Sequence, residues 1–198
     1  MKRALLLALC ILAVAGASAW GYWARTWDTI GGYSSPEPAR DGNNVWIGAF
    51  GQWPGDCVPD YASLEVQANA IHLDIYDAYS MEYCFGIPTD YDVGDWANNL
   101  PAGTYDVYVW QWSNLWPLPQ EEYDYVRGGE YLMQLKVYYR GDITLDGKVN
   151  VFDLQRLAAS WNKQQGQAGY DPACDLNGDN RVNVFDLQVV ARDWNKSI

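Results

Sequence analysis

Two stretches near the C-terminus place oxygen-bearing side chains at the same spacing. The first stretch begins at Asp142, and the second begins thirty-three residues later at Asp175. If each start is position 1 of a twelve-residue loop, both loops carry such side chains at positions 1, 3, 5, 9 and 12. The side chains are Asp142, Thr144, Asp146, Asn150 and Asp153 in the first loop, and Asp175, Asn177, Asp179, Asn183 and Asp186 in the second.

This spacing favours calcium, a hard cation that takes about six to eight oxygen ligands. Position 7, Lys148 or Arg181, would add a backbone carbonyl in each loop. The chain must turn sharply at position 6, where Gly147 and Asn180 tolerate a left-handed backbone. Position 12 is Asp, which reaches less far than the Glu of an EF-hand. An Asp- and Asn-rich solvated turn would explain one loop, but it explains two matching loops poorly.

An apolar pattern follows each loop with the spacing i, i+3, i+4, i+7, which predicts two amphipathic helices. Helices this short are unstable alone, so we expect their apolar faces to pack against each other. The predicted faces are Leu154, Leu157, Ala158 and Trp161 in the first repeat, and Leu187, Val190, Ala191 and Trp194 in the second.

The two repeats together resemble a known family. They read "DITLDGKVNVFDLQRLAASW" (142–161) and "DLNGDNRVNVFDLQVVARDW" (175–194), and a polar connector (162–174) joins them. Residues 140–198 resemble a type I dockerin domain. The resemblance implies two bound Ca²⁺ ions, a cohesin domain as partner, and a setting in which secreted proteins assemble for polysaccharide degradation. The generic EF-hand is the competing family, but Pro172 argues against a helix entering the second loop.

The resemblance also implies which residues contact the partner. Positions 10 and 11 are Val151–Phe152 in the first repeat and Val184–Phe185 in the second. A folded loop would present these side chains outward at the start of each helix. Identical pairs imply that the partner could bind in two orientations related by a half-turn. The alternative is that each Phe packs inside the domain.

The loops differ at position 3, where Thr144 replaces the Asn177 of the second loop. Because a hydroxyl is the weaker ligand, we predict that the first loop binds calcium more weakly. We also expect calcium binding and folding to be linked, since the unfolded chain has no preformed site.

The preceding segment, residues 20–139, alternates apolar and polar residues with frequent turn signals, which predicts a mainly β domain. A small antiparallel β-sandwich fits best, and "LPAGTYDVYVW" (100–110) loosely resembles immunoglobulin-like and fibronectin-like bacterial modules. The predicted strands are 43–51, 63–67, 71–78, 101–112 and 130–139, with a hairpin connection at "ANA" (68–70).

The N-terminus predicts export. Lys2 and Arg3 precede an apolar run, and "ASA" (17–19) supplies small residues, a pattern typical of a signal peptide spanning residues 1–19. The apolar run is short for a membrane anchor, and no later segment could span a bilayer. The formal charge is −12, and it becomes about −14 without Lys2 and Arg3. Such a chain repels nucleic acid and anionic membranes, so we expect a secreted or cell-surface protein.

Three cysteines would remain after cleavage: Cys57, Cys84 and Cys174. Because exported chains meet oxidising conditions, one disulfide is expected and one thiol is left over. We favour Cys57–Cys84, since both residues lie in the predicted β domain. Cys174 is then either a quiet buried thiol or a crosslinking site.

The β domain shows no catalytic set of residues. Its single histidine, His72, lies on a strand pattern, and no two carboxylates are paired by the sequence. Tyr108, Trp110 and Trp112 alternate along one strand, so they could form an outer face that binds carbohydrate or protein. The alternative is that these aromatics pack within the sandwich.

Three functional hypotheses follow. The leading one is a non-catalytic protein whose dockerin attaches a β-sandwich binding or adhesion module to a cohesin-bearing scaffold or surface. The second is a small polysaccharide-degrading hydrolase whose catalytic residues are not recognisable. The third is a calcium-stabilised structural protein that has no cohesin partner.

Overall fold

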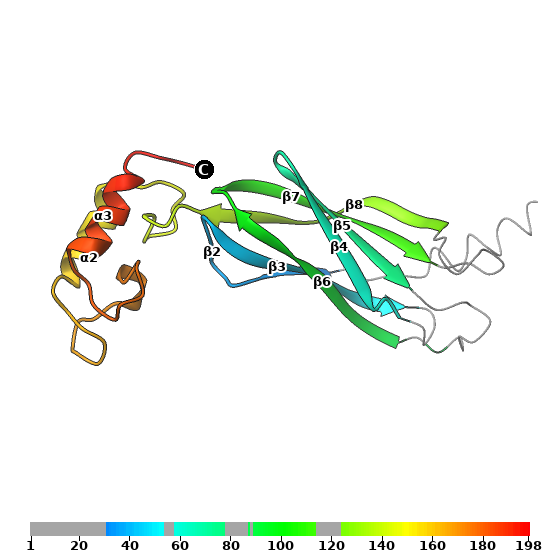
Figure 1. Ribbon diagram of the computed structural model, residues 1–198, viewed down its shortest axis with the longest axis horizontal. Coiled ribbons are helices and arrows are strands. Elements are labelled where there is room, and N and C mark those ends of the chain that lie inside the picture. The colour runs from blue at the N-terminus through cyan, green and yellow to red at the C-terminus, as the bar shows by residue number, and fades with distance from the viewer. Residues whose placement is uncertain (1–30, 54–57, 78–86, 88, 114–123) are drawn as a thin grey trace, which may run out of the picture. The chain divides into compact units, whose positions relative to one another are not determined.

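The computed structural model of the chain describes residues 31–53, 58–77, 87, 89–113 and 124–198. This part is mostly β structure, and two α-helices lie near its C-terminus (Figure 1), as the sequence predicts. The strands are β1 (Gly31–Ser35), β2 (Ala39–Arg40), β3 (Asn43–Trp53), β4 (Tyr61–Gln67), β5 (Ala70–Asp77), β6 (Thr89–Leu100), β7 (Gly103–Ser113) and β8 (Asp124–Tyr138).

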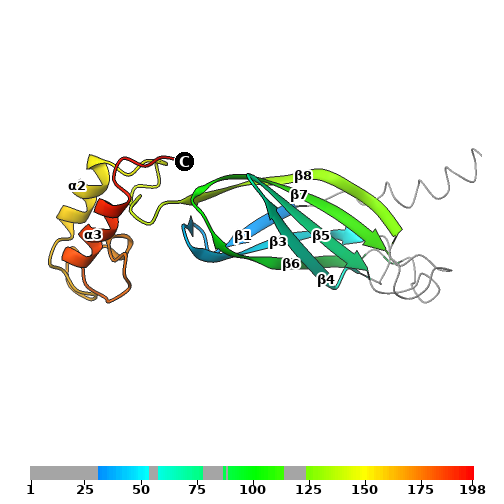
Figure 2. The same ribbon diagram turned by 45° about the horizontal axis from the view of Figure 1, so that its top comes forward.

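The strands form two sheets, which confirms the predicted sandwich. One sheet has the order β1-β3-β6, and the other has the order β2-β8-β7-β5-β4. Figure 2 shows the three-stranded sheet facing strands of the five-stranded one. The predicted hairpin is present, because β4 and β5 pair antiparallel through to Gln67 and Ala70 across a two-residue turn.

Two neighbouring pairs are parallel, a feature that the antiparallel prediction did not contain. Strand β5 pairs with β7 in parallel, with Ile71 opposite Val107, and β2 pairs with β8 in parallel. The reason is connectivity: after β5 the chain crosses to the other sheet in β6 and returns in β7, so β5 and β7 run the same way. Side-chain alternation has period two in both arrangements and therefore does not distinguish them.

The sandwich core is built from the predicted inward faces. Because successive strand residues point to opposite sides, every second residue is buried. The buried side chains include Val45, Ile47 and Ala49 of β3, Ile71, Leu73 and Ile75 of β5, Tyr105, Val107 and Val109 of β7, and Leu135 and Val137 of β8.

The sequence pattern did not predict three of the strands, β1, β2 and β6. Strands β1 and β2 are short, and β6 carries Asp and Gly at alternate positions, residues that are depleted in strands. The opposite face of β6 is apolar, however, and buries Tyr91 and Val93. Tertiary contact with the other sheet therefore outweighs the poor strand preference of its outer residues.

The described residues divide into two compact units. One unit combines residues 34–45, 97–105 and 134–198, and the other contains the remaining described residues. The division crosses several strands. The predicted boundary between residues 139 and 140 stays a prediction.

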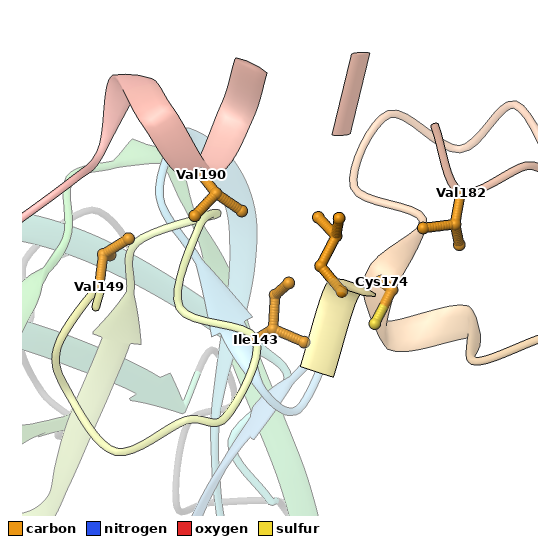
Figure 3. Packing of buried hydrophobic residues seen from close by; sticks show 6 residues of the cluster. Ile143, Val149, Cys174, Val182 and Val190 are labelled. Atoms are coloured by element: carbon orange, nitrogen blue, oxygen red, sulfur yellow. The ribbon is translucent and has the colours of Figure 1, made fainter. Parts of the chain in front are cut away.

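The C-terminal segment contains helices α2 (Val151–Ala159) and α3 (Val184–Arg192), which contact each other, and a short 3₁₀ turn, η2 (Pro172–Cys174). Figure 2 shows the two helices side by side. Leu157 of α2 and Val190 of α3 lie in one apolar cluster, which confirms the predicted helix packing at these positions. The cluster also contains Ile143, Val149, Cys174 and Val182, which Figure 3 shows around the same interior.

The prediction is wrong for the later residues of the two apolar faces, which are exposed. Ala158 and Ala191 are exposed. Trp161 and Trp194 lie beyond the last residue of their helices, and their exposed fractions are 44% and 46%. Each helix is only nine residues long, so the i+7 continuation of the pattern falls after its end.

The two repeats are linked to each other by matching backbone contacts. Lys148 of the first loop forms a bridge with Ser197, and Arg181 of the second forms a bridge with Gln164. Each loop thus pairs with the segment that follows the opposite helix. This exchange joins the repeats into one domain, and neither repeat is complete without the other.

Two predictions lie outside the described residues: the signal peptide at 1–19 and the Cys57–Cys84 disulfide. Cys174, by contrast, is a buried free thiol. Within the described ranges, no helix is both long and apolar enough to cross a membrane.

Candidate calcium loops and partner surface

Hydrogen bonds gather the predicted ligands of the first loop around its backbone. Asp142 accepts from the amides of Leu145 (2.8 Å) and Gly147 (2.9 Å). Thr144 Oγ1 lies 2.9 Å from Asp153 Oδ1 and 3.5 Å from Asp142 Oδ1. Positions 1, 3 and 12 are therefore neighbours, although they are far apart along the loop.

The remaining side chains of this loop also meet. Asn150 Nδ2 lies 3.5 Å from Asp146 Oδ2, so positions 5 and 9 are close. Asp146 Oδ1 accepts from the amide of Lys148 at position 7. The five predicted side-chain ligands of the first loop thus fall into two groups of neighbours within one loop.

The second loop repeats this arrangement. Asp175 accepts from the amides of Gly178, Asp179 and Asn180 at 2.8–3.1 Å. Asp179 accepts from the side-chain amides of Asn177 (3.1 Å) and Asn183 (3.3 Å). Asp186 accepts from the amide of Asn177 at 3.2 Å. All five positions of the second loop are therefore joined in one network.

The sharp turn predicted at position 6 is present in both loops. Gly147 has φ +87°, and Asn180 has φ +66°. Both values lie in the left-handed region, which Gly enters freely and Asn enters more readily than most residues. The turn directs the amides of positions 4 and 6 toward the carboxylate at position 1.

Positions 9 and 12 have a second role that the sequence reading missed. Asn150 is the N-cap of α2: its side chain accepts from the Phe152 amide, and Asp153 accepts from the Asn150 amide. Asn183 and Asp186 form the same capping box at α3. Each pair satisfies amides that a helix start would otherwise leave unbonded. The motif D/N-x-x-D preceding an apolar run was the available signal.

Two carboxylates of the first loop are buried close to each other. Asp142 and Asp153 are almost completely buried. Burial raises the pKa of the Asp142 carboxyl above its ordinary value; the bond from the Gly147 amide opposes this, and the charge of Asp153 adds to it. A divalent cation between these carboxylates would remove the repulsion.

Two arginines contact the backbone of the first loop. Arg40 of β2 donates to the carbonyls of Tyr139 and Asp142. Arg156 of α2 donates to the carbonyl of Ile143 at 2.8 Å and forms an ion pair with Asp171 at 2.8 Å. The second repeat has Val189 where the first has Arg156, so the two loops differ in nearby positive charge.

The donor set fits calcium by its chemistry. The described residues contain no group of three or more His, Cys, Asp or Glu side chains arranged to hold a metal by themselves. The neutral oxygens of Thr144, Asn150, Asn177 and Asn183 must therefore complete the sites. A carboxylate has about four lone-pair directions, so the hydrogen bonds described above leave capacity for a cation. All-oxygen, partly neutral sets are the ones that calcium accepts.

The predicted partner residues are exposed. Val151 and Phe152 open α2 and have exposed fractions of 51% and 58%, while Val184 and Phe185 open α3 with 49% and 57%. The alternative that each Phe packs inside the domain is therefore excluded. Position 18 is exposed in both repeats, as Ala159 and Arg192.

The comparison with protein families decides the nature of this segment. Residues 140–195 match the model of the dockerin type I domain. This segment is a type I dockerin domain. Dockerin domains are non-catalytic interaction modules, and those of type I bind calcium. The match covers the two loops, both helices and the connector between them.

Other comparisons add little beyond the dockerin. No curated protein matches the chain significantly. Two solved structures from Acetivibrio cellulolyticus match it, a C-terminal and an N-terminal interface mutant of a type II cohesin–X–dockerin complex. They are 13% and 14% identical to this chain, cover 85% of it and 83% of their own chains, and have TM-scores of 0.29 and 0.28.

The aromatic row predicted in the β domain has the expected orientation. Tyr105, Val107 and Val109 are buried, so Tyr108, Trp110 and Trp112 lie on the outer face of the five-stranded sheet. Two of these rings stack on aromatic side chains of the neighbouring strand β5. The His72 ring stacks on Trp110 at 4.4 Å, and Tyr76 stacks on Trp112 at 6.4 Å. His72 is thus an aromatic packing partner in this row.

Proposed function

We propose that the chain is an exported, non-catalytic protein whose dockerin binds two calcium ions and docks on a cohesin domain, with the β-sandwich as the attached binding module. The observation that carries the proposal is the exposed Val–Phe pair, which occurs twice at the first turn of a capped helix. A polysaccharide-degrading assembly is the expected setting, because dockerins commonly serve it.

The chain's own residues explain why calcium would control docking. Asn150 and Asp153 are both predicted ligands and the capping box of α2, and Val151 and Phe152 lie between them. The position of the apolar pair therefore depends on the loop conformation. Bound calcium would supply positive charge to the carboxylate cluster and hold that conformation.

Exposure supports a partner-binding role for the two pairs. Large exposed apolar side chains at adjacent positions are unusual on a small soluble domain unless a partner covers them. The two pairs have nearly equal exposed fractions, and both helices start with the same cap. Equal presentation supports binding in either of two orientations.

A pull-down experiment tests the proposal. The full mature chain is incubated with a panel of immobilised cohesin domains of both types, with calcium or with a chelator. We expect at least one cohesin to retain the protein in calcium and to release it in chelator. Retention by none of them in calcium would contradict the proposal and favour a stand-alone structural role.

Variants identify the surface. Replacing Val151, Phe152, Val184 and Phe185 together by Ala should abolish retention, whereas replacing one pair should leave most of it because the other pair can substitute. Tyr61→Ala is the matched control, since Tyr61 is 60% exposed on β4. If the fourfold variant still binds its cohesin, recognition uses another surface.

A further inference from the structure

The outer face of the three-stranded sheet carries aromatic rings that the sequence reading did not single out. Tyr33 of β1, Trp46 and Phe50 of β3, and Trp96 of β6 all point away from the buried side of their strands, on the sheet β1-β3-β6 that Figure 2 shows. Phe50 and Trp96 have exposed fractions of 45% and 49%. This group of four rings is called the ring platform below.

Glycines allow three of these rings to lie across the neighbouring strand. A Cβ atom at Gly31 would overlap the Phe50 ring, and one at Gly48 would overlap the Tyr33 ring. At Gly94 it would lie 2.8 Å from Cε2 of Trp46. Glycine within a strand often marks a place where another group approaches the backbone closely. At Gly31 and Gly48 that group is an aromatic ring, and at Gly94 it is the Ile47 carbonyl together with the Trp46 ring.

Direct contacts hold the rings in this arrangement. The Trp46 indole donates to the Tyr33 hydroxyl at 3.2 Å, and that hydroxyl donates to Asp92 at 2.9 Å. Trp96 packs edge-on against Trp46 with ring centroids 5.4 Å apart. A ligand would therefore meet a surface that is already ordered, which lowers the entropy lost on binding.

The polar groups around the rings determine what could bind. Strands β1, β3 and β6 contain no Lys or Arg. Asp92 is exposed beside the rings, and Gln52 donates to Asp90 at 3.4 Å on the same face. This face repels anions and offers acceptors for hydroxyl donors. A pyranose matches it, because a sugar ring has an apolar C–H face and a rim of hydroxyl groups.

The ring platform suits this ligand better than the row on the opposite sheet. In that row the His72 ring stacks on Trp110, and Gly128 of β8 lies so close to the Trp110 ring that an added Cβ would overlap it. Both faces of the Trp110 ring are thus packed against neighbours. On the platform, by contrast, the three rings that lie over glycines contact the backbone, and Phe50 and Trp96 remain nearly half exposed.

We propose that the ring platform binds a neutral polysaccharide. This deepens the binding-module part of the proposed function by naming a ligand class and its site, but it does not depend on the dockerin. The protein would hold the polysaccharide by stacking of sugar rings on Phe50 and Trp46, by contact with the exposed part of Trp96, whose ring plane lies 69° from that of Trp46, and by hydroxyl donation to Asp92.

Co-sedimentation of the full mature chain with microcrystalline cellulose, chitin and insoluble mannan tests the proposal. We expect at least one of them to bind the protein equally in calcium and in chelator. Phe50→Ala and Trp96→Ala should each weaken that binding by about tenfold, the effect of losing a central aromatic contact. Both residues are exposed, so folding should survive, and circular dichroism checks this.

Gly31→Ala is the sharper variant. It keeps every ring but fills the space under Phe50, so that this ring must stand away from the sheet. Binding should fall as far as in Phe50→Ala if the ligand requires the Phe50 ring to lie against the sheet. Tyr131→Ala, which removes a 58% exposed ring from β8, should bind like the wild type.

Several results would overturn the proposal. They are absence of binding to all three polysaccharides, unchanged binding in Phe50→Ala and Trp96→Ala, or loss of binding only in Tyr131→Ala. The proposal would also be overturned if the chain bound an immobilised protein in a way that Phe50→Ala abolishes while it bound no polysaccharide. Cohesin pull-down should remain normal in Phe50→Ala and Gly31→Ala, so failure here is distinguishable from failure of dockerin function.

Discussion

At the residue scale, the two Asp residues at position 12 link the predicted metal sites to the helices. Asp153 and Asp186 are fully buried, yet each accepts hydrogen bonds from the loop and from the N-cap amide. Burying a carboxylate is costly unless it is paired or hydrogen-bonded. The observed bonds meet part of that cost, and a cation would meet the rest.

The environment of Cys174 distinguishes between the two roles considered for it, a buried thiol and a crosslinking site. It lies in the core of the dockerin with no exposed surface, and burial raises the pKa of its thiol to about 12. A buried, protonated thiol is a poor nucleophile. The alternative of a crosslinking cysteine therefore has no support from its environment.

We predict that no thiol of the folded mature protein reacts with a thiol reagent such as DTNB at pH 8. In denaturant without reductant, one thiol per chain should react, because Cys174 becomes exposed while Cys57 and Cys84 stay paired. Absorbance at the reagent's product band measures both values. Three reactive thiols in denaturant would rule out the disulfide, and one in the folded state would contradict the burial argument.

At the element scale, the repeats are alike in their helices and different around their loops. Both helices have the same cap and the same buried leucine or valine at the centre of the cluster. Only the first loop has Thr at position 3 and arginine donors on its backbone carbonyls. These differences bear on calcium affinity and leave the fold unchanged.

We predict that the second loop fills with calcium before the first. Thr144 is a weaker ligand than Asn177, and the positive charges of Arg40 and Arg156 oppose a nearby cation. Calorimetric titration of Asp179→Ala, which leaves only the first loop, should show weaker binding than titration of Asp146→Ala. The two variants are matched because both remove position 5. Tighter binding by the Asp179→Ala variant would contradict the prediction.

A buried carboxylate also connects α3 to the chain segment before the first loop. Asp193 accepts from the Gly141 amide at 3.2 Å, Arg192 at 3.0 Å and Lys196 at 3.1 Å. Burial by itself would raise the pKa of Asp193, but the hydrogen bonds from Arg192 and Lys196 outweigh it and hold the pKa below its usual range.

Asp193→Asn should therefore lower the free energy of unfolding at pH 7 by about 2 kcal/mol, the scale for a hydrogen bond to a charged group. Because the pKa of Asp193 is lower in the folded protein than in the unfolded chain, the ionised carboxylate stabilises the fold fully above the ordinary Asp pKa of about 3.9. This stabilisation is lost as the pH falls through the pKa of Asp193 in the folded protein. The difference between wild type and variant should thus shrink only in acid. Denaturant unfolding in saturating calcium, from pH 7 down to a pH below the ordinary Asp pKa, measures it; a difference already lost at about pH 5 would contradict the assignment.

At the scale of the whole molecule, the two parts are stabilised differently. The sandwich buries two facing apolar layers, whereas the dockerin has one small cluster around Leu157 and Val190 and two carboxylate-rich loops. A domain with so small a core commonly needs a metal or crosslink. Calcium should therefore matter for the dockerin and much less for the sandwich.

We predict that chelation makes only the dockerin sensitive to protease. With EDTA, trypsin should cut after Arg156, Lys163 and Arg181, while a fragment containing β1 to β8 persists; with calcium, both parts should resist. Mass spectrometry of timed digests identifies the cuts. Equal resistance with and without EDTA would mean that the dockerin folds without metal.

Much of this architecture could be read from local patterns. The clustering of the loop side chains, the turn at position 6, the exposed Val–Phe pairs and most long strands follow from spacing and alternation, because these depend on residues close in the chain. Trp161 and Trp194 show the limit of that approach: they match a helical pattern, but the helices end before them. Where a helix stops depends on the whole domain.

The sequence by itself determined that this protein carries a duplicated loop–helix module after a β domain, since each loop and helix face lies within about twenty consecutive residues. Only the tertiary structure decided which strands run parallel, how each loop pairs with the opposite repeat, and where aromatic rings lie over glycines of a neighbouring strand. Phe50 and Gly31 are nineteen residues apart, and Trp46 and Gly94 forty-eight. Such contacts arise from strand order and register, which no local pattern records.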